Sequence, residues 1–530
     1  MAASGGASSN GGSTSASGGN GTGGAMSGGS TSGGTGSTNG GSTSGGSTSG
    51  GSTSGGSTSG GTATTSGGST TTSGGTTSAG ASNGGTTTNG GTTASGGTTT
   101  TNGGTATASG GTTTTSGGTT TTSGGTATTG GSGAVVTGPF GNYGQDTKAG
   151  SGGTVIKVTT LAASGTGSLA AALAMTGPRI IVFEVGGVID LNRAKITISQ
   201  PFVTVAGQTA PSPGITLIRG GLTVTTHDVK LQHLRFRMGD AGAAAASGFE
   251  PDVTTDGVNA YNIVFDHCSV AWGVDENLSV SGPRFDGVTG TSRNVTISNN
   301  IIAEGLYNSV HSKGVHSMGT LIHDYCTDIA VIGNFYAHNN ERNPWFKGFA
   351  RGVISNNLVY NPGVWAMRLG AVLSEWTSSG ITPQPPAVSV IGNVMRYGTN
   401  TPANSPMVGS NSSGTAYLED NINTTTSGAS APLSGAQVTL LSTKPAWPNG
   451  FVARPASQVQ DWVLAHAGAR PKDCDAVDLR LIADFKAGKG AFIDSQDQVG
   501  GYPTATPTQR TLTVPANVDA WLTQLATELE

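Results

Sequence analysis

The stretch 338-HNNERNPWFKG-348 sets two cations, Arg342 and Lys347, around Pro344 and Trp345, directly after a predicted β-strand. Positive charges held at fixed positions can stabilise an anionic intermediate. Pro344 restricts the backbone just after Arg342 and helps to aim that side chain. Lone basic residues are more often surface charges on a turn. The stretch is therefore either a basic corner or a catalytic one, and the surrounding elements must decide between these interpretations.

A short strand with alternating apolar residues recurs along the following and preceding sequence. The copies are 229-VKLQHLRF, 262-NIVFDHCSV, 294-NVTISNNII, 328-DIAVIGNFY, 352-GVISNNLVY, 388-VSVIGNVM and 417-YLEDNI. When they are aligned on their apolar positions, five Asn fall at one place, with spacings of 34, 23, 36 and 28 residues: Asn300, Asn334, Asn357, Asn393 and Asn421. Cys268 falls at the same place and is predicted to be a small buried residue.

This repeat predicts an all-β solenoid, a right-handed parallel β-helix. The period of two without alternating helices argues against βαβ units. Successive coils would lie about 4.8 Å apart, so the Asn side chains would stack and satisfy one another's buried amides. A β-propeller is the alternative, although each of its blades needs four strands in about 40–45 residues.

A solenoid needs caps at its ends. Residues 166–175 are predicted to form a short helix that closes the first coil, capped by Ser168 or Thr166. Two amphipathic stretches, 457–471 and 515–530, are expected to cover the C-terminal edge or the side of the sheets, with Pro515 at the first helical position. We therefore expect one β-helix domain over 134–530, with a capping segment over 440–530.

Residues 1–133 differ from the rest of the chain. They contain no charged or aromatic residue and consist of repeats such as GGSTSGGSTSGG. Such a segment has too little apolar surface to offset the entropy of ordering it. The prediction is a disordered Gly/Ser/Thr linker in front of the folded domain.

Composition excludes several classes of protein. The net charge of −4, without a basic stripe, argues against nucleic acid as a partner. Three cysteines allow at most one disulfide and show no metal-binding spacing. No run of about 18 apolar residues predicts a membrane span, and the start MAASGGASSNGG lacks the apolar segment of a secretory signal.

Several motifs, in order, resemble the pectate lyase family of parallel β-helix proteins. They are NIVFDHCSVAWGVDENLSV (262–280), NVTISNN (294–300), HSMGTLI (316–322), NNERNPWFKG (339–348) and VISNNLVYN (353–361). GSLAAAL, RIIVFEVGGVIDL and the late stretch 468–501 resemble bacterial members too. The resemblance covers roughly residues 150–502 and leaves the linker out.

The resemblance implies specific roles. Arg342, Pro344 and Lys347 match an R-x-P-x-x-R/K pattern in which the Arg is the catalytic base. Many relatives have Arg where this chain has Trp345. The substrate-binding Lys has no clean counterpart because 303–315 resembles an insertion, which leaves Lys313 and His316 as candidates for substrate binding, beside Lys347 and Trp345.

The resemblance also implies a Ca²⁺ site. Asp256 matches its first carboxylate and Asp275 matches the first member of an acidic pair, whose second position holds Ser279. Glu276 or Asp252 could compensate for this serine. Hard carboxylate oxygens suit Ca²⁺. The alternative is that Asp256 serves a TTDG turn and that Asp275 and Glu276 form a solvated loop pair.

The expected activity is a calcium-dependent pectate lyase that cleaves 1,4-linked polygalacturonate by β-elimination. It would be a secreted or cell-surface monomer that acts on polysaccharide. A calcium-independent pectin lyase would not need Asp256 and Asp275. A β-helix adhesin or carbohydrate-binding protein without catalysis is a third hypothesis, suggested by Ser279 and Trp345. A polygalacturonase-type hydrolase needs a cluster of paired carboxylates, which the sequence does not show.

Overall fold

The computed structural model describes residues 142–530 together with 114–115 and 118–119. The chain divides into two units, Met1–Thr120 and Thr121–Glu530. In the first unit, β1 (Thr114–Thr115) and β2 (Gly118–Thr119) pair as antiparallel strands. The predicted linker over 1–133 lies otherwise outside the described residues, so it stays a prediction.

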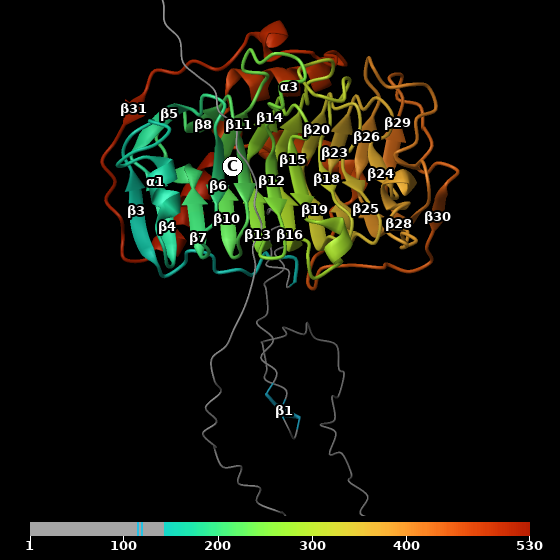
Figure 1. The fold of residues 1–530 in the computed structure, drawn as a ribbon, viewed down its shortest axis with the longest axis horizontal. Coiled ribbons are helices and arrows are strands. Elements are labelled where there is room, and N and C mark those ends of the chain that lie inside the picture. Colours follow the sequence, from blue (N-terminus) through green and yellow to red (C-terminus); the bar gives the residue numbers. More distant parts are fainter. Residues whose placement is uncertain (1–113, 116–117, 120–141) are drawn as a thin grey trace, which may run out of the picture. The chain divides into compact units, whose positions relative to one another are not determined.

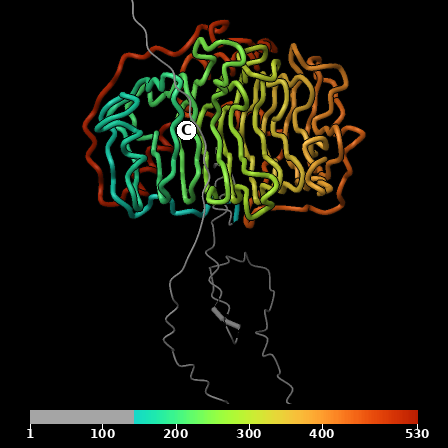
Figure 2. The backbone as a smooth tube through the Cα atoms, in the orientation of Figure 1, coloured from blue at the N-terminus to red at the C-terminus, as the bar shows by residue number. Residues whose placement is uncertain are grey.

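The second unit is a stack of coils, and each typical coil contributes one strand to each of three sheets (Figures 1 and 2). We call these sheets one, two and three. Sheet one has eleven parallel strands: β3 (Thr154–Val158), β4 (Arg179–Phe183), β7 (Val203–Ala206), β10 (Val229–Gln232), β13 (Tyr261–Asp266), β16 (Arg293–Ser298), β19 (Thr327–Ile332), β22 (Arg351–Ser355), β25 (Ala387–Ile391), β28 (Gly414–Glu419) and β30 (Val438–Leu440).

Sheet two has ten strands: β5 (Val185–Asp190), β8 (Ile215–Ile218), β11 (Leu234–Arg237), β14 (Ser269–Ala271), β17 (Ile301–Ala303), β20 (Phe335–Ala337), β23 (Leu358–Tyr360), β26 (Val394–Arg396), β29 (Ile422–Thr424) and β31 (Thr508–Gln509). Sheet three has eight: β6 (Lys195–Ile198), β9 (Gly221–Val224), β12 (Val253–Asp256), β15 (Leu278–Ser281), β18 (Leu321–Ile322), β21 (Trp345–Phe346), β24 (Met367–Leu369) and β27 (Val408–Ser410). Within sheets two and three only β31 pairs in the antiparallel sense, with β5. The predicted parallel β-helix is confirmed.

The core is a column of apolar side chains inside the coils. Ile263 lies in register with Val229 on one side and Val295 on the other, and Val295 with Ile329. All four are fully buried. Burying such a side chain stabilises the folded state by roughly 1.5–3 kcal/mol. The apolar positions of each strand therefore stack on those of the next coil and stabilise the solenoid along its length.

The Asn ladder forms as predicted at the turn between sheets one and two. Each side-chain amide donates to the Oδ1 of the next Asn, at 2.9, 2.9, 3.0 and 3.1 Å along the series Asn300, Asn334, Asn357, Asn393 and Asn421. The backbone N–H of Cys268 donates to Asn300 Oδ1 at 2.7 Å, which extends the ladder by one coil. In the coils that form the ladder, buried polar groups at this turn are therefore paired with one another.

The first coil is closed by α1 (Leu169–Ala174), and Ser168 caps it by accepting the Ala171 N–H. The C-terminal segment contains α2 (Ala456–His466), α3 (Ala476–Ala487) and α4 (Val518–Leu529). It runs back along the side of the coils toward β5, where β31 joins sheet two (Figures 1 and 2). Of the two predicted placements, the side of the sheets is the observed one.

The predicted position of Pro515 is wrong. The last helix begins at Val518, and the side chain of Asn517 caps it by accepting the Ala520 N–H at 3.1 Å. The described part of the chain also has short 3₁₀ helices at Gly207–Thr209, Arg284–Asp286, Leu373–Trp376, Pro471–Asp473 and Gln496–Val499. Among the described residues, no helix has the length and apolar character to cross a bilayer.

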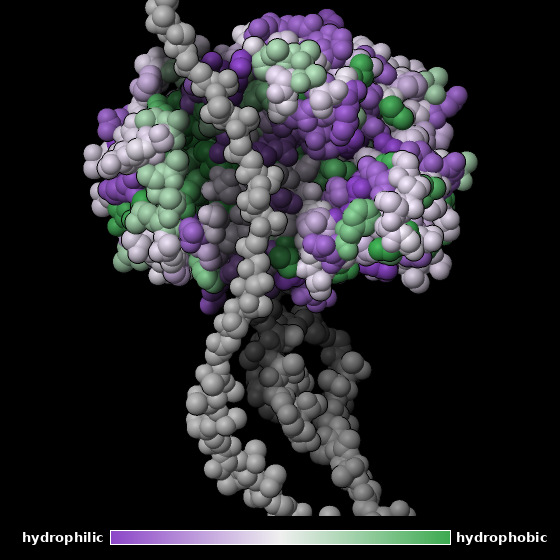
Figure 3. Space-filling model, in the orientation of Figure 1, coloured by the Kyte–Doolittle hydropathy of each residue, from purple (hydrophilic) through white to green (hydrophobic). Residues whose placement is uncertain are grey.

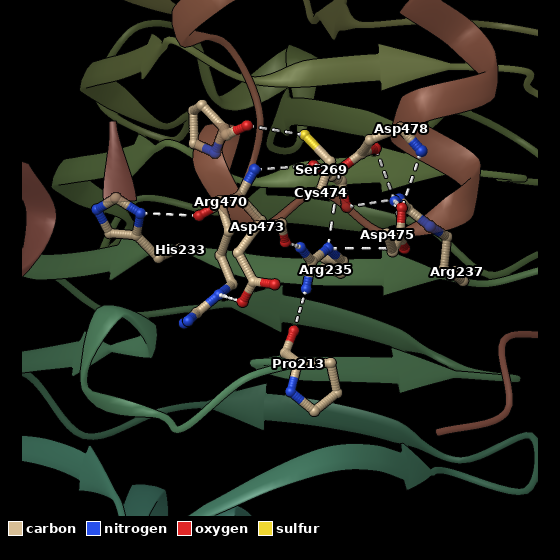
Figure 4. Close-up of polar contacts among 12 residues, drawn as sticks. Pro213, His233, Arg235, Arg237, Ser269, Arg470, Asp473, Cys474, Asp475 and Asp478 are labelled. Carbon is tan, nitrogen blue, oxygen red and sulfur yellow. Dashed lines mark hydrogen bonds and ion pairs between the residues drawn. The ribbon is translucent and has the colours of Figure 1, made fainter. Parts of the chain in front are cut away.

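A buried ion cluster fastens α3 to sheet two (Figure 4). Arg237 Nη2 donates to Asp478 Oδ1 at 2.8 Å and to Asp475 Oδ2 at 3.0 Å. Ser269 Oγ donates to Asp478 Oδ2 at 2.7 Å. Arg235 reaches the same two carboxylates at 3.6–3.7 Å. At this cluster the C-terminal segment thus covers the outer face of sheet two.

Candidate active site

A polar groove of about 520 Å³ crosses the outer face of sheet three. Its floor is the row of outward side chains that alternate with the core residues of β15, β18 and β21: Ser279, Leu321 and Trp345. Charged residues stand around this floor, and they include most of the predicted site residues: Asp275, Glu276, Lys313, His316, Arg342 and Lys347. The visible face of this unit is predominantly hydrophilic over the later coils, with more hydrophobic surface over the first coils at the left (Figure 3).

Arg342 lies at the centre of the groove, in the loop that leads into β21. Its guanidinium is ion-paired with Glu276 and lies 4.0 Å from Asp275 Oδ1. The Arg342 Nε is buried without a hydrogen-bond partner among the described residues. Burial, assisted by the charge of Arg368, lowers the pKa of Arg342 to about 10 although Asp275 opposes the shift. Burial thus works toward the neutral guanidinium, whereas the ion pair with Glu276 works toward the charged one.

Trp345 is buried in the floor of the groove, so its ring is not exposed for stacking on a ligand. It is 3% exposed, and its indole N–H donates to Gly370 O at 2.9 Å. Arg368, from the next coil, stacks on the ring at 3.8 Å, and Arg342 lies 5.1 Å from the ring centre on its own loop. Arg368 is also held by Glu341 at 2.7 Å. The indole therefore contacts two guanidinium groups and helps to hold them in place.

Lys347 is held at one end of the groove. Its Nζ lies 2.5 Å from Glu375 Oε2 and 3.3 Å from the buried Asp324 Oδ2. Arg284 Nη2 binds the same Glu375 oxygen at 2.6 Å. One carboxylate oxygen thus bridges two cations at the groove surface. Lys347 and Arg284 could bind a carboxylate of a ligand in the same way.

The groove carries three carboxylates that fit a hard cation. Asp275 and Glu276 lie beside Arg342, and Asp252 lines the same space just before β12. Asp252 Oδ1 is buried and forms an ion pair with Lys195 Nζ at 3.0 Å. Burial raises the pKa of Asp252, although Lys195 opposes the shift. The chemistry of this donor set fits Ca²⁺.

Asp256 is placed elsewhere. It is exposed at the last position of β12 and does not line the groove. A strand advances about 3.3 Å per residue, so Asp256 lies on the order of 13 Å along the strand from Asp252. Of these two residues, Asp252 lines the groove and Asp256 does not. Ser279, at the second position of the expected acidic pair, lies on the groove floor without a carboxylate.

His316 and Lys313 enter the groove from the loop between β17 and β18. His316 Nε2 lies 2.9 Å from Asp275 Oδ1, while Lys313 is exposed at the rim. Burial works to raise the pKa of Asp275, but His316, Arg342 and His311 outweigh it and lower this pKa to about 2. Asp275 is thus ionised and already held by cations or imidazoles.

The sequence prediction missed four residues at the groove. Arg284 and Glu375 line it, and His311 and Arg368 contact residues that line it. Three of them lie in connecting loops whose lengths differ from coil to coil, so no repeat position identified them. The sequence could have indicated Arg368. It precedes Leu369 in a three-residue strand, and alignment of this strand with the preceding coil pairs Arg368 with Trp345.

Comparison with known proteins decides the family. The "Probable pectate lyase C" of Aspergillus terreus is 33% identical over 371 residues, which cover 68% of this chain and 79% of that protein. The "Probable pectate lyase C" of Neosartorya fischeri is 32% identical over 374 residues, with the same two coverages. The chain belongs to the pectate lyase family. The predicted resemblance is confirmed, and membership of this family makes the protein a polysaccharide lyase.

Among solved structures, a thermostable pectate lyase aligns with a TM-score of 0.45 at 15% identity, covering 62% of this chain and 97% of that one. A pectate lyase bound to a hexasaccharide aligns with a TM-score of 0.44 at 14% identity, covering 63% and 97%. No family model matches the chain.

Proposed function

We propose that this pectate lyase cleaves 1,4-linked polygalacturonate by β-elimination and that Arg342 removes the C5 proton. The observation that carries the proposal is the position of the Arg342 guanidinium, which is largely buried and contacts both the groove carboxylates and Trp345. Among the described residues, this groove is where most of the predicted site residues meet.

The reaction needs a base and a place for negative charge. The C5 proton lies next to a carboxylate, so its removal gives an enolate-like intermediate, and the C4 oxygen then leaves. A neutral Arg342 can accept this proton, and burial increases its neutral fraction. Once protonated, the same guanidinium stabilises the intermediate electrostatically. Lys347 and Arg284 are positioned to bind a neighbouring uronate carboxylate in place of Glu375.

Calcium is part of the proposal. Asp252, Asp275 and Glu276 would hold the ion, with Asp252 in the role first expected of Asp256. When bound, Ca²⁺ would withdraw charge from the substrate carboxylate as a Lewis acid. We also propose that the enzyme is a monomer that is secreted or held at the cell surface. It would act on unesterified polymer, because the cations of its groove can bind the free carboxylates.

The test is ultraviolet absorbance of unsaturated product from polygalacturonate and from highly methyl-esterified pectin, each with added Ca²⁺ and with chelator. We expect calcium-dependent product that is larger with polygalacturonate. Product that appears equally with chelator, mainly from methylated pectin, would indicate a pectin lyase. No product from either polymer, together with measurable polymer binding, would indicate a carbohydrate-binding protein.

A further inference from the structure

A cluster of aromatic rings adjoins the end of the groove that holds Lys347. Its members lie in the loops that leave four successive strands of sheet three: Phe285 after β15, Tyr325 after β18, Phe349 after β21 and Trp376 after β24. Tyr325 and Phe349 stack with centroids 4.1 Å apart and planes 9° from parallel. Trp376 packs against both of them, and Phe285 meets Trp376 edge-on at 5.6 Å. The four rings therefore form one connected group.

The members of this group differ in exposure. Trp376 is 2% exposed and supports the others. Phe285, in contrast, is 53% exposed, and Leu373, which lies in the same short helix as Trp376, is 59% exposed. Exposed apolar side chains that are held by a buried ring form a preformed surface, and such surfaces mark binding sites more often than they serve folding.

Arg284 connects the aromatic cluster to the groove. Its guanidinium lies 5.8 Å from the centre of the Phe285 ring and 5.9 Å from that of Trp376. The same side chain lines the groove, where it binds Glu375 at 2.6 Å and the buried Asp324 at 3.1 Å. Phe285 follows Arg284 in the chain and does not line the groove itself. The exposed ring thus lies just beyond the cationic end of the groove.

A polymer that is seated in the groove has to continue beyond its ends. At the cationic end, a chain that passes Arg284 meets the exposed ring of Phe285. The face of an aromatic ring carries partial negative charge, whereas one face of a pyranose ring presents mainly C–H groups with partial positive charge. Contact between these two faces is therefore attractive, and it also removes apolar surface from water.

We propose that Phe285, supported by Trp376, is a stacking subsite for a sugar residue of the polymer that lies just outside the groove. The inference rests on the proposed function, because it takes the polymer to be polygalacturonate bound through Lys347 and Arg284. The subsite lengthens the bound segment without contacting the reacting residue. It should therefore strengthen the binding of long chains more than that of short ones.

Binding is tested by isothermal titration of the full chain that carries Arg342→Ala, so that ligands are not cleaved. The ligands are oligogalacturonates from the dimer to the hexamer, with added Ca²⁺. Phe285→Ala in this background should weaken hexamer binding by roughly two- to tenfold, the range of one aromatic contact, and should change dimer binding least. Phe285→Trp should restore the hexamer affinity.

Phe202→Ala is the matched control. Phe202 is 39% exposed and also packs edge-on against another ring, that of His227 at 5.2 Å, but it lies outside the groove. Its replacement should leave the affinities for all of the oligomers unchanged. Thermal unfolding of each variant shows whether it is folded.

Three results would overturn the proposal. They are unchanged hexamer binding in Phe285→Ala, an equal loss for the dimer and the hexamer, and an equal loss in Phe202→Ala. A background protein that binds none of the oligomers would contradict the proposed substrate and the subsite together. Cleavage that persists in the background would contradict only the role of Arg342, and the KM values for the same oligomers would then test the subsite.

Discussion

The Asn ladder and the groove lie on different faces of the same coils and are built in opposite ways. At the ladder, one residue type repeats, and every amide is paired with its counterpart above or below. At the groove, no position repeats. Arg342, His316 and Glu375 come from different coils, and the buried Arg342 Nε lacks a hydrogen-bond partner among the described residues.

The difference separates stability from chemistry. A paired buried amide lowers the free energy of the folded coils but has no capacity left for a ligand. Groups that stay unsatisfied cost stability, and they are available to substrate or ions. Mutations on the two faces should therefore change different quantities, and the following experiments test that separation.

The largest effect should come from Arg342→Ala. Loss of a general base that also stabilises the intermediate should lower kcat by at least about 10³-fold, with little change in the midpoint of thermal unfolding. The matched control is Arg351→Ala, at an exposed arginine outside the groove. Equal activity in the two variants would remove Arg342 from the mechanism.

Asp275 and Asp256 provide a pair that distinguishes the groove from its surroundings. Asp275→Asn should reduce calcium-dependent activity by roughly 10²-fold, because an amide replaces a charged ligand. Asp256→Asn should leave it within about twofold, since Asp256 is exposed outside the groove. Calcium titrations of the rate measure both. Strong loss in Asp256→Asn would restore the first prediction for the calcium site.

On the ladder, Asn334→Ala should change stability instead. It leaves the Ile297 carbonyl and neighbouring ladder groups unpaired, at roughly 1–3 kcal/mol for each buried group. Asn421→Ala, at the half-buried end of the ladder, should cost less. Denaturant unfolding gives the stabilities, and kcat of the folded fraction should be unchanged. A fall in kcat without a fall in stability would contradict the separation.

The pH profile tests how Arg342 is tuned. Burial and Arg368 lower the pKa of Arg342 to about 10, so kcat/KM should rise with pH up to that region as neutral Arg342 accumulates. Arg368→Met removes one of the lowering charges. The rising limb should then move to higher pH, and the rate below that limb should fall. An unmoved limb would mean that Arg368 acts only through packing on Trp345.

The smallest expected effect is on substrate affinity. Glu375 holds Lys347 and Arg284 in the free enzyme, so a substrate carboxylate must compete with it. Glu375→Gln keeps the shape and removes the charge. KM for polygalacturonate should fall several-fold, with kcat little changed and KM for methylated pectin unaffected. A higher KM would show that Glu375 positions these cations rather than competing for them.

The coils and the Asn ladder were predictable from the sequence. The strands alternate with a period of two and an Asn recurs once in each coil, so the pattern itself indicates which residues stack. Family motifs pointed to Arg342, Lys347 and Asp275, and the insertion-like loop pointed to His316. All four line the groove, and their roles stay predictions. The sequence matched Asp256 to the first calcium carboxylate, whereas the residue that lines the groove is Asp252, four positions earlier. Only the register of β12 with β15 shows which of the two reaches the groove.

Residues from loops of unequal length were beyond sequence reasoning. Glu375, Arg284 and His311 follow no period, and their contacts form only when distant coils stack. The direction of the C-terminal segment was also left open. It is set by the buried pairing of Arg237 with Asp475 and Asp478, residues more than two hundred positions apart.

The most direct measurement of the central claim is mass analysis of the end products from polygalacturonate with calcium. β-Elimination at the groove predicts oligosaccharides with an unsaturated terminal residue, each lighter by one water than its hydrolysis counterpart. Arg342→Ala should give none of them. Saturated products of hydrolytic mass, or unsaturated products that persist in Arg342→Ala, would contradict the account.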